Sequence, residues 1–81
     1  MHFVRDVAYK SEYKLLLTFE NGVVKLADME PYLEGEIFES LKDIDYFKTV
    51  SVSHDIDTIV WDNDADVSPD FLYEVGVVQK V

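Results

Sequence analysis

The feature that most constrains the fold is an Asn-Gly pair between two runs rich in apolar residues. Residues 13–20 (YKLLLTFE) precede Asn21-Gly22, and residues 23–28 (VVKLAD) follow it. Because Asn and Gly tolerate the positive φ angles of a type I′ turn, this arrangement predicts a β-hairpin. A loop of about two residues sets three cross-strand pairs: Phe19 with Val24, Leu17 with Leu26, and Thr18 with Lys25. The first two pairs would form an apolar face and the third a polar one.

A further strand is expected before the hairpin, and a change of direction after it. Residues 3–9 (FVRDVAY) indicate a strand, and Lys10-Ser11-Glu12 supplies a polar turn. Together with the hairpin they predict a three-stranded antiparallel meander. Met29-Glu30-Pro31 ends this pattern, because proline cannot donate to a strand ladder and disfavours helical geometry in the residue before it.

The middle of the chain predicts one short amphipathic helix, in which apolar and polar residues occupy opposite sides. The apolar side consists of Leu33, Ile37, Phe38 and Leu41. The polar side consists of Glu34, Glu36, Glu39 and Ser40. Gly35 lies at or before the start of this helix, which is expected to cover one sheet face. Its carboxylates then form a solvated side, with a docking surface as the alternative.

Two further strands are expected after the helix. Residues 46–53 and 58–61 are rich in β-branched and aromatic residues, and residues 54–57 link them. The residues expected on or near their buried face are Val50, Val52, Ile59 and Trp61.

The end of the chain predicts a helix over residues 69–75. Ser68 can cap it, and Pro69 suits its first position. Asp70 favours the positive end of the helix dipole, and Gly76 can close the helix. Residues 77–81 form either an added strand or a tail.

The predicted elements define the fold class as α+β, in a single small domain over residues 1–81. It comprises an antiparallel β-meander, an amphipathic helix, two further strands and a short C-terminal helix. A chain of 81 residues buries only about 60% of its unfolded surface, but its large apolar content suffices for a core.

Composition excludes several classes of function. The chain has no cysteine, which excludes disulfides, thiolate zinc sites and thiol nucleophiles. Residues 1–6 lack the order of a secretory signal, and no apolar run approaches the roughly 20 residues that span a bilayer. We therefore expect a cytoplasmic protein that is not embedded in a membrane.

Charge points to the kind of partner. Seventeen acidic and seven basic residues give a net charge of −10, which disfavours direct binding to nucleic acids and to anionic lipid surfaces. A basic protein partner would be attracted to such a surface. Solubility alone is the other explanation of the same charge.

The segment Asp62-Asn63-Asp64-Ala65-Asp66 is the strongest candidate for ion binding, since its alternate carboxylates resemble the start of a calcium loop. That pattern then fails, because Val67 replaces the required glycine and Tyr73 the required glutamate. A polar turn that leads into Ser68 explains the same residues. We therefore assign no metal-binding, cofactor-binding or catalytic residue, and expect no cofactor.

Two other residues have both a functional and a structural interpretation. His54 is flanked by Asp55 and lies near Asp57, which could orient a general base, but a solvated turn residue is the favoured interpretation. Trp61 is expected in the core, and an exposed anchor for a partner is the alternative.

Motif residues in the order and spacing of this chain resemble those of the bacterial and phage domain-of-unknown-function family 2442. They are Asp28, Pro31, Tyr32, Leu33, Gly35, Ile37, Phe38, Leu41, Asp43, Phe47, Val50, Val52, Ile59, Trp61, Asp66, Ser68, Pro69, Leu72 and Tyr73. The resemblance covers nearly the whole chain. It implies the same α+β fold and supplies no catalytic residue.

The resemblance also implies two settings for such a chain. Some members resemble the front half of proteins with a helix-turn-helix domain, and others resemble members of toxin–antitoxin-like pairs. Because the sequence stops soon after Tyr73, no appended helix-turn-helix domain is expected. Members usually follow the tryptophan with proline, a polar residue and glycine. Here Asp64 stands at the glycine position, where a positive φ would carry a steric cost.

The leading functional hypothesis is a protein-interaction module and not an enzyme. As the antitoxin-like member of a pair, it would use its acidic face and a sheet edge to contact a basic, neighbour-encoded protein. The first alternative is a small metal-dependent enzyme or ion sensor built on Asp62, Asp64 and Asp66, with His54 or Asp57 nearby. A ligand-sensing domain with an apolar cavity is a further alternative. Homo-oligomerisation through an exposed strand stays open.

Overall fold

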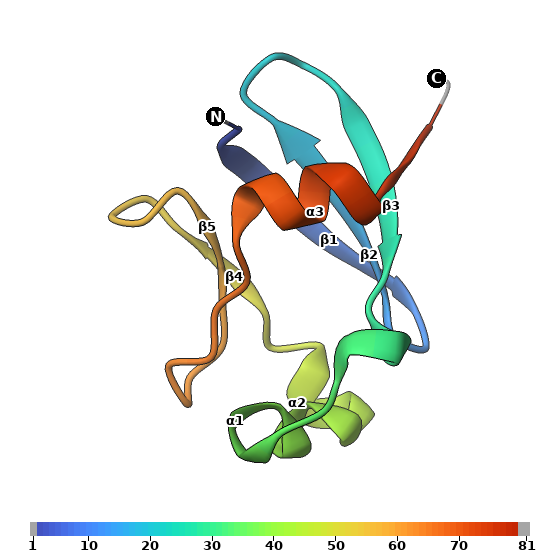
Figure 1. The fold of residues 1–81 in the computed structure, drawn as a ribbon, viewed down its shortest axis with the longest axis vertical. Helices are drawn as coiled ribbons and strands as arrows, with labels where there is room; N and C mark the ends of the chain where they lie inside the picture. The colour runs from blue at the N-terminus through green and yellow to red at the C-terminus, as the bar shows by residue number, and fades with distance from the viewer. Residues whose placement is uncertain (1, 80–81) are drawn as a thin grey trace.

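Four antiparallel strands form the main sheet in the order β1-β2-β3-β6 in the computed structural model, which describes residues 2–79 (Figure 1). The strands are β1 (Val4–Ser11), β2 (Lys14–Phe19), β3 (Val24–Asp28) and β6 (Val77–Val78). The first three are the predicted meander, but Lys10 and Ser11, expected in the turn, belong to β1, and the turn lies at residues 12–13. β6 pairs with β3 and shows that the segment after Gly76 adds a strand, while residues 80–81 lie outside the described residues.

The loop between β2 and β3 is one residue longer than expected. The Phe19 N–H donates to the Val23 carbonyl and the Gly22 N–H donates to the Phe19 carbonyl, both at 2.9 Å. Gly22 has a φ of 85°, as the last residue of such a three-residue hairpin loop requires. The Asn21 side chain accepts the Val23 N–H at 3.1 Å, which stabilises the longer loop.

This loop shifts the hairpin register by one residue. Thr18 lies opposite Val24, and Leu17 lies opposite Lys25. A shift of one residue turns every side chain of a strand to the other face. Lys25 is therefore on the buried face, at 9% exposure, and Val24 and Leu26 are on the other face. The predicted pairs Phe19–Val24, Leu17–Leu26 and Thr18–Lys25 are wrong.

Helix α3 (Pro69–Val75) lies across the main sheet (Figure 1). Its bounds are those predicted, with Pro69 in the first turn and the Ser68 hydroxyl accepting the Phe71 N–H at 3.5 Å. Gly76 ends the helix with an ordinary φ of −71°. Glycine is required at this position because a Cβ would lie only 2.8 Å from the Lys25 Cβ.

The predicted amphipathic helix corresponds to two consecutive short pieces, α1 (Glu36–Glu39) and η2 (Ser40–Lys42). With η1 (Glu30–Tyr32) before them and α2 (Ile44–Phe47) after them, they make a series of four short helices. They gather near one end of the main sheet and do not cover a sheet face (Figure 1). Asp43 interrupts the helical run, because its extended backbone and its side chain, which accepts the Asp45 N–H, begin α2.

The apolar side of the expected helix is only partly buried. Leu33 and Leu41 belong to the core, Phe38 packs against it, and Ile37 is 47% exposed. The carboxylates of the other side are exposed as expected.

A second sheet pairs β4 (Ser51–Ser53) with β5 (Thr58–Val60). The first of these strands is shorter than predicted, because residues 46–47 belong to α2. Val52 lies opposite Ile59, in agreement with the expected shared face. Both sheets contribute to one core. Its buried apolar residues are Val4, Leu15, Leu17, Phe19, Ala27, Met29, Leu33, Leu41, Phe47, Ile59, Trp61, Ala65 and Leu72.

The ring of Tyr73 joins distant parts of the chain. The His2 ring stacks on it with centroids 3.6 Å apart, and Lys25 Nζ lies 3.6 Å from its centre. Since one face of a ring admits one group at that distance, His2 and Lys25 lie on opposite faces. Phe19 contacts the ring edge-on at 4.9 Å, and the His2 N–H donates to Asp70 Oδ1 at 2.8 Å. We call this arrangement the Tyr73 clamp.

Candidate functional site

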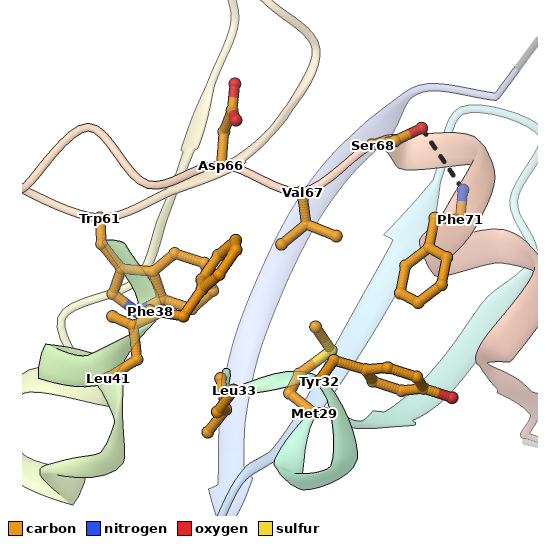
Figure 2. Close-up of a pocket in the computed structure, with 10 residues that line it drawn as sticks. All are labelled: Met29, Tyr32, Leu33, Phe38, Leu41, Trp61, Asp66, Val67, Ser68 and Phe71. Carbon is orange, nitrogen blue, oxygen red and sulfur yellow. Dashed lines mark hydrogen bonds between the residues drawn. The ribbon is translucent and has the colours of Figure 1, made fainter. Parts of the chain in front are cut away.

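An apolar pocket of about 370 Å³ opens between the short helices, the loop after β5 and the start of α3 (Figure 2). It is lined by Met29, Tyr32, Leu33, Phe38, Leu41, Trp61, Asp66, Val67, Ser68 and Phe71. Its volume is at the lower end of the range of about 300–1,000 Å³ for small-molecule sites. Several of these residues also carry the family resemblance, among them Tyr32, Trp61 and Ser68.

Aromatic side chains form two facing walls of this pocket. Phe38 and Trp61 stand on one side, with Tyr32 and Phe71 on the other (Figure 2). Tyr32 and Phe71 contact each other edge-to-face, with centroids 4.9 Å apart. Tyr32 is 41% exposed, so one wall reaches the open surface.

Trp61 is held in its wall by a hydrogen bond to the backbone of α2. Its indole N–H donates to the Phe47 carbonyl at 2.9 Å, and the residue is only 3% exposed. The predicted core position is confirmed, and the alternative of an exposed anchor is wrong. No local pattern in the sequence indicated that the buried tryptophan also borders a pocket.

The loop after Trp61 is attached to α1 by one side chain. Asn63 Nδ2 donates to the Ile37 carbonyl at 2.9 Å, while Asn63 Oδ1 accepts the Ala65 N–H at 3.1 Å. Asp64 adopts a φ of 67°, the positive value expected for a position where the family usually has glycine. This loop therefore holds the Trp61 wall against the Phe38 helix.

Exposed carboxylates are frequent in the segments that line the pocket. The two segments that line it, residues 29–41 and 61–71, contain no Lys or Arg. Their acidic residues, which we call the acidic rim, are all exposed: Glu30, Glu34, Glu36, Glu39, Asp62, Asp64, Asp66 and Asp70. Within residues 2–79, one ion pair forms, between Lys42 Nζ and Glu39 Oε2 at 3.3 Å. The rim is therefore a region of concentrated negative charge.

The candidate ion-binding carboxylates do not form a ligand set in the part of the chain that the structure describes. Asp62, Asp64 and Asp66 are exposed. The Asp66 carboxylate points away from the apolar side chains (Figure 2). Among residues 2–79, no group of three or more His, Asp or Glu side chains is arranged to hold a metal ion. His54 and Asp57 are not brought to these carboxylates as ligands.

His54 lies in the exposed turn between β4 and β5, and the predicted turn position is confirmed. It borders a smaller cavity of about 230 Å³ together with Arg5, Glu20 and Asp57. Asp57 has a positive φ of 59°, and its carbonyl accepts the Val4 N–H at 2.9 Å. These contacts give the turn a structural role, since they attach it to β1.

Fold and site together define a small α+β protein with an apolar pocket whose two lining segments are rich in exposed carboxylates. A family model described as "Protein of unknown function (DUF2442)" matches residues 4–76, so the chain belongs to that family. No curated protein and no solved structure was found to match the chain. No helix within residues 2–79 combines the length and apolarity needed to cross a bilayer.

Proposed function

We propose that this chain is a protein-interaction module that binds a partner more basic than itself. The observation that carries this proposal is an apolar pocket lined by two segments that hold eight exposed carboxylates and no Lys or Arg, the acidic rim. An apolar hollow supplies burial, and the surrounding charge attracts and orients a cationic surface.

The shape of the site separates this proposal from a metal-dependent enzyme. Catalysis by carboxylates requires several of them to converge on a reacting atom. Here Asp66 is the one acidic residue among residues 2–79 that lines the apolar hollow, and its carboxylate is turned away from it. Side chains from separate segments leave a hollow between them, so the site is concave and not a flat or convex contact face.

The setting we propose is a pair of small proteins encoded side by side, in which this chain has the antitoxin-like role. Co-expression with the neighbour-encoded protein, followed by size exclusion, tests this. The two should co-elute at low salt and separate as salt rises, because the rim charges are exposed and easily screened. If they never co-elute at low salt, the proposal is wrong.

A matched variant checks the contribution of the rim. Replacing Asp62 and Asp66 together by Asn should weaken co-elution at moderate salt. Replacing Asp6 and Asp55, which are exposed outside the pocket segments, should not.

A second candidate function is the sensing of a small neutral apolar ligand. The apolar lining of the 370 Å³ pocket favours it, because such pockets bind small molecules in many proteins. Titration with benzyl alcohol, followed through the emission of Trp61, tests it. A saturable change at low concentration would favour this function over the first.

A further inference from the structure

We propose that the pocket receives one large apolar side chain from a segment of the partner that carries Lys or Arg on both sides. The proposal rests on the proposed function and names the chemistry of the partner. The part of the site it concerns is the space between the Trp61–Phe38 wall and the Tyr32–Phe71 wall (Figure 2).

The size and lining of the pocket favour a single side chain. A volume of about 370 Å³ is at the small end for ligand sites, so a folded element does not fit inside. Four aromatic rings border the space, and rings contact one another favourably through their edges and faces. Phe and Leu are therefore the side chains best suited to enter.

The surroundings favour a polypeptide over a free small molecule. Tyr32 is 41% exposed, and Ile37, next to the pocket residue Phe38, is 47% exposed. Tyr32 lines the hollow but stays partly exposed, and Ile37 does not line it, so a small ligand within the hollow would leave apolar surface of both in water. A peptide backbone that continues beyond its anchoring side chain can cover it.

The charge of the rim determines what flanks the anchor. Eight exposed carboxylates and no Lys or Arg occur in the two pocket segments. Cationic residues beside the anchor are attracted, and acidic residues or phosphate groups are repelled. Exposed ion pairs contribute little affinity each, so the pocket supplies most of the binding and the rim supplies selectivity.

Hydrogen bonds within the chain fix the Trp61 wall of the pocket without a partner. Asn63 joins the Trp61 loop to the Ile37 carbonyl, and the Trp61 indole is bonded to the Phe47 carbonyl. A preformed site binds more tightly, because less order must be created on association.

Synthetic peptides test the proposal directly. Three short peptides without Trp carry Lys and Arg around a central Phe, Leu or Ala, and a fourth carries Glu around Phe. Since Trp61 is the sole tryptophan, its emission reports occupancy of the pocket. The Phe and Leu peptides should bind about tenfold more tightly than the Ala peptide and shift the emission. The acidic peptide should bind more weakly than the basic Phe peptide, because the carboxylates of the rim repel it.

Variants locate the binding. Tyr32→Ala and Phe71→Ala each remove part of one wall and should weaken the Phe peptide about tenfold. Ile56→Ala is the matched control, because Ile56 is 47% exposed and does not line the pocket. Circular dichroism confirms folding of each variant. If Phe71→Ala does not fold, Tyr32→Ala decides, because Tyr32 is 41% exposed and lies outside the core cluster.

Other outcomes overturn the proposal. Equal affinity for the Phe, Leu and Ala peptides, or no effect of Tyr32→Ala, would place the contact outside the pocket. Failure of all the basic peptides to bind would also overturn the proposal. A shift in Trp61 emission by benzyl alcohol that matches the Phe peptide would identify a small-molecule site instead. Co-elution with the neighbour-encoded protein that is insensitive to Tyr32→Ala removes this inference but leaves the proposed function intact.

Discussion

At the scale of single residues, Lys25 shows how a charge is accommodated on a buried face. Its ammonium lies 3.6 Å from the centre of the Tyr73 ring and donates to the Tyr73 carbonyl in the last turn of α3. A cation is favourable both over an aromatic face and at the C-terminal end of a helix. The stem of Lys25 packs against Gly76, so the lysine attaches α3 to the sheet.

Replacing Lys25 by Met tests this attachment. Met keeps most of the packing and removes the charge, so we expect the free energy of unfolding to fall by about 1–2 kcal/mol. Urea unfolding measures the change. The control is Lys10→Met on the exposed β1 surface, which should change stability by less than about 0.5 kcal/mol. Equal stability of Lys25→Met and the parent protein would contradict the assigned role.

Asp64 provides a second test at this scale, because its φ of 67° is unfavourable for a residue with a Cβ. Asp64→Gly should stabilise the protein by up to about 1 kcal/mol, and Asp64→Val should destabilise it by about 1–2 kcal/mol. Thermal unfolding measures both. Asp62→Gly serves as the control, since Asp62 has no positive φ and glycine there should be destabilising. A stabilising effect of Asp64→Val would show that the turn is not strained.

At the scale of elements, a feature was predicted correctly where neighbouring residues determine it, and less well where residues distant in the sequence do. α3 was predicted with its correct bounds, because Ser68 and Pro69 determine its start locally. The hairpin was predicted, but its register was not. That register depends on Asn21 bonding to the Val23 N–H, and on α3 covering Lys25 from a distant part of the chain.

The pocket could not be predicted for the same reason. Its walls come from residues 29–41 and 61–71, and no local pattern states that these two segments face each other. Trp61 was predicted to be buried because of its residue type alone. Asp43 was a local signal in the sequence for the start of α2, since Asp is a frequent N-cap.

The link between the Trp61 loop and α1 depends on Asn63. Asn63→Asp keeps the acceptor for the Ala65 N–H but loses the donor to the Ile37 carbonyl, so we expect a loss of about 1 kcal/mol. Asn63→Ala loses both bonds and should cost more. Urea unfolding gives the stabilities, and acrylamide quenching of Trp61 shows whether the wall loosens. Unchanged quenching in both variants would mean that the Phe47 carbonyl alone fixes Trp61.

At the scale of the whole molecule, the net charge of −10 opposes compaction. Raising NaCl from about 0.01 M to about 1 M shortens the Debye length from about 30 Å to about 3 Å. The melting temperature should therefore rise with salt, because repulsion among the carboxylates is screened. Differential scanning calorimetry measures it. A variant with Glu34→Gln, Glu36→Gln and Asp62→Asn should show a smaller rise, and a fall with salt in the parent would contradict the expectation.

The Tyr73 clamp has a consequence for how the molecule opens. The Tyr73 ring of α3 contacts both His2 and Lys25 of the hairpin. Neither α3 nor the segment at His2 can therefore detach without breaking contacts to β3 or to the ring. Amide protons of β3 and α3 should therefore exchange with deuterium through the same global opening. Removal of the ring by Tyr73→Ala should let the amides of α3 exchange sooner than those of β3. Helix α3 would then unfold separately from the sheet, and the unfolding of the whole molecule would lose its cooperativity.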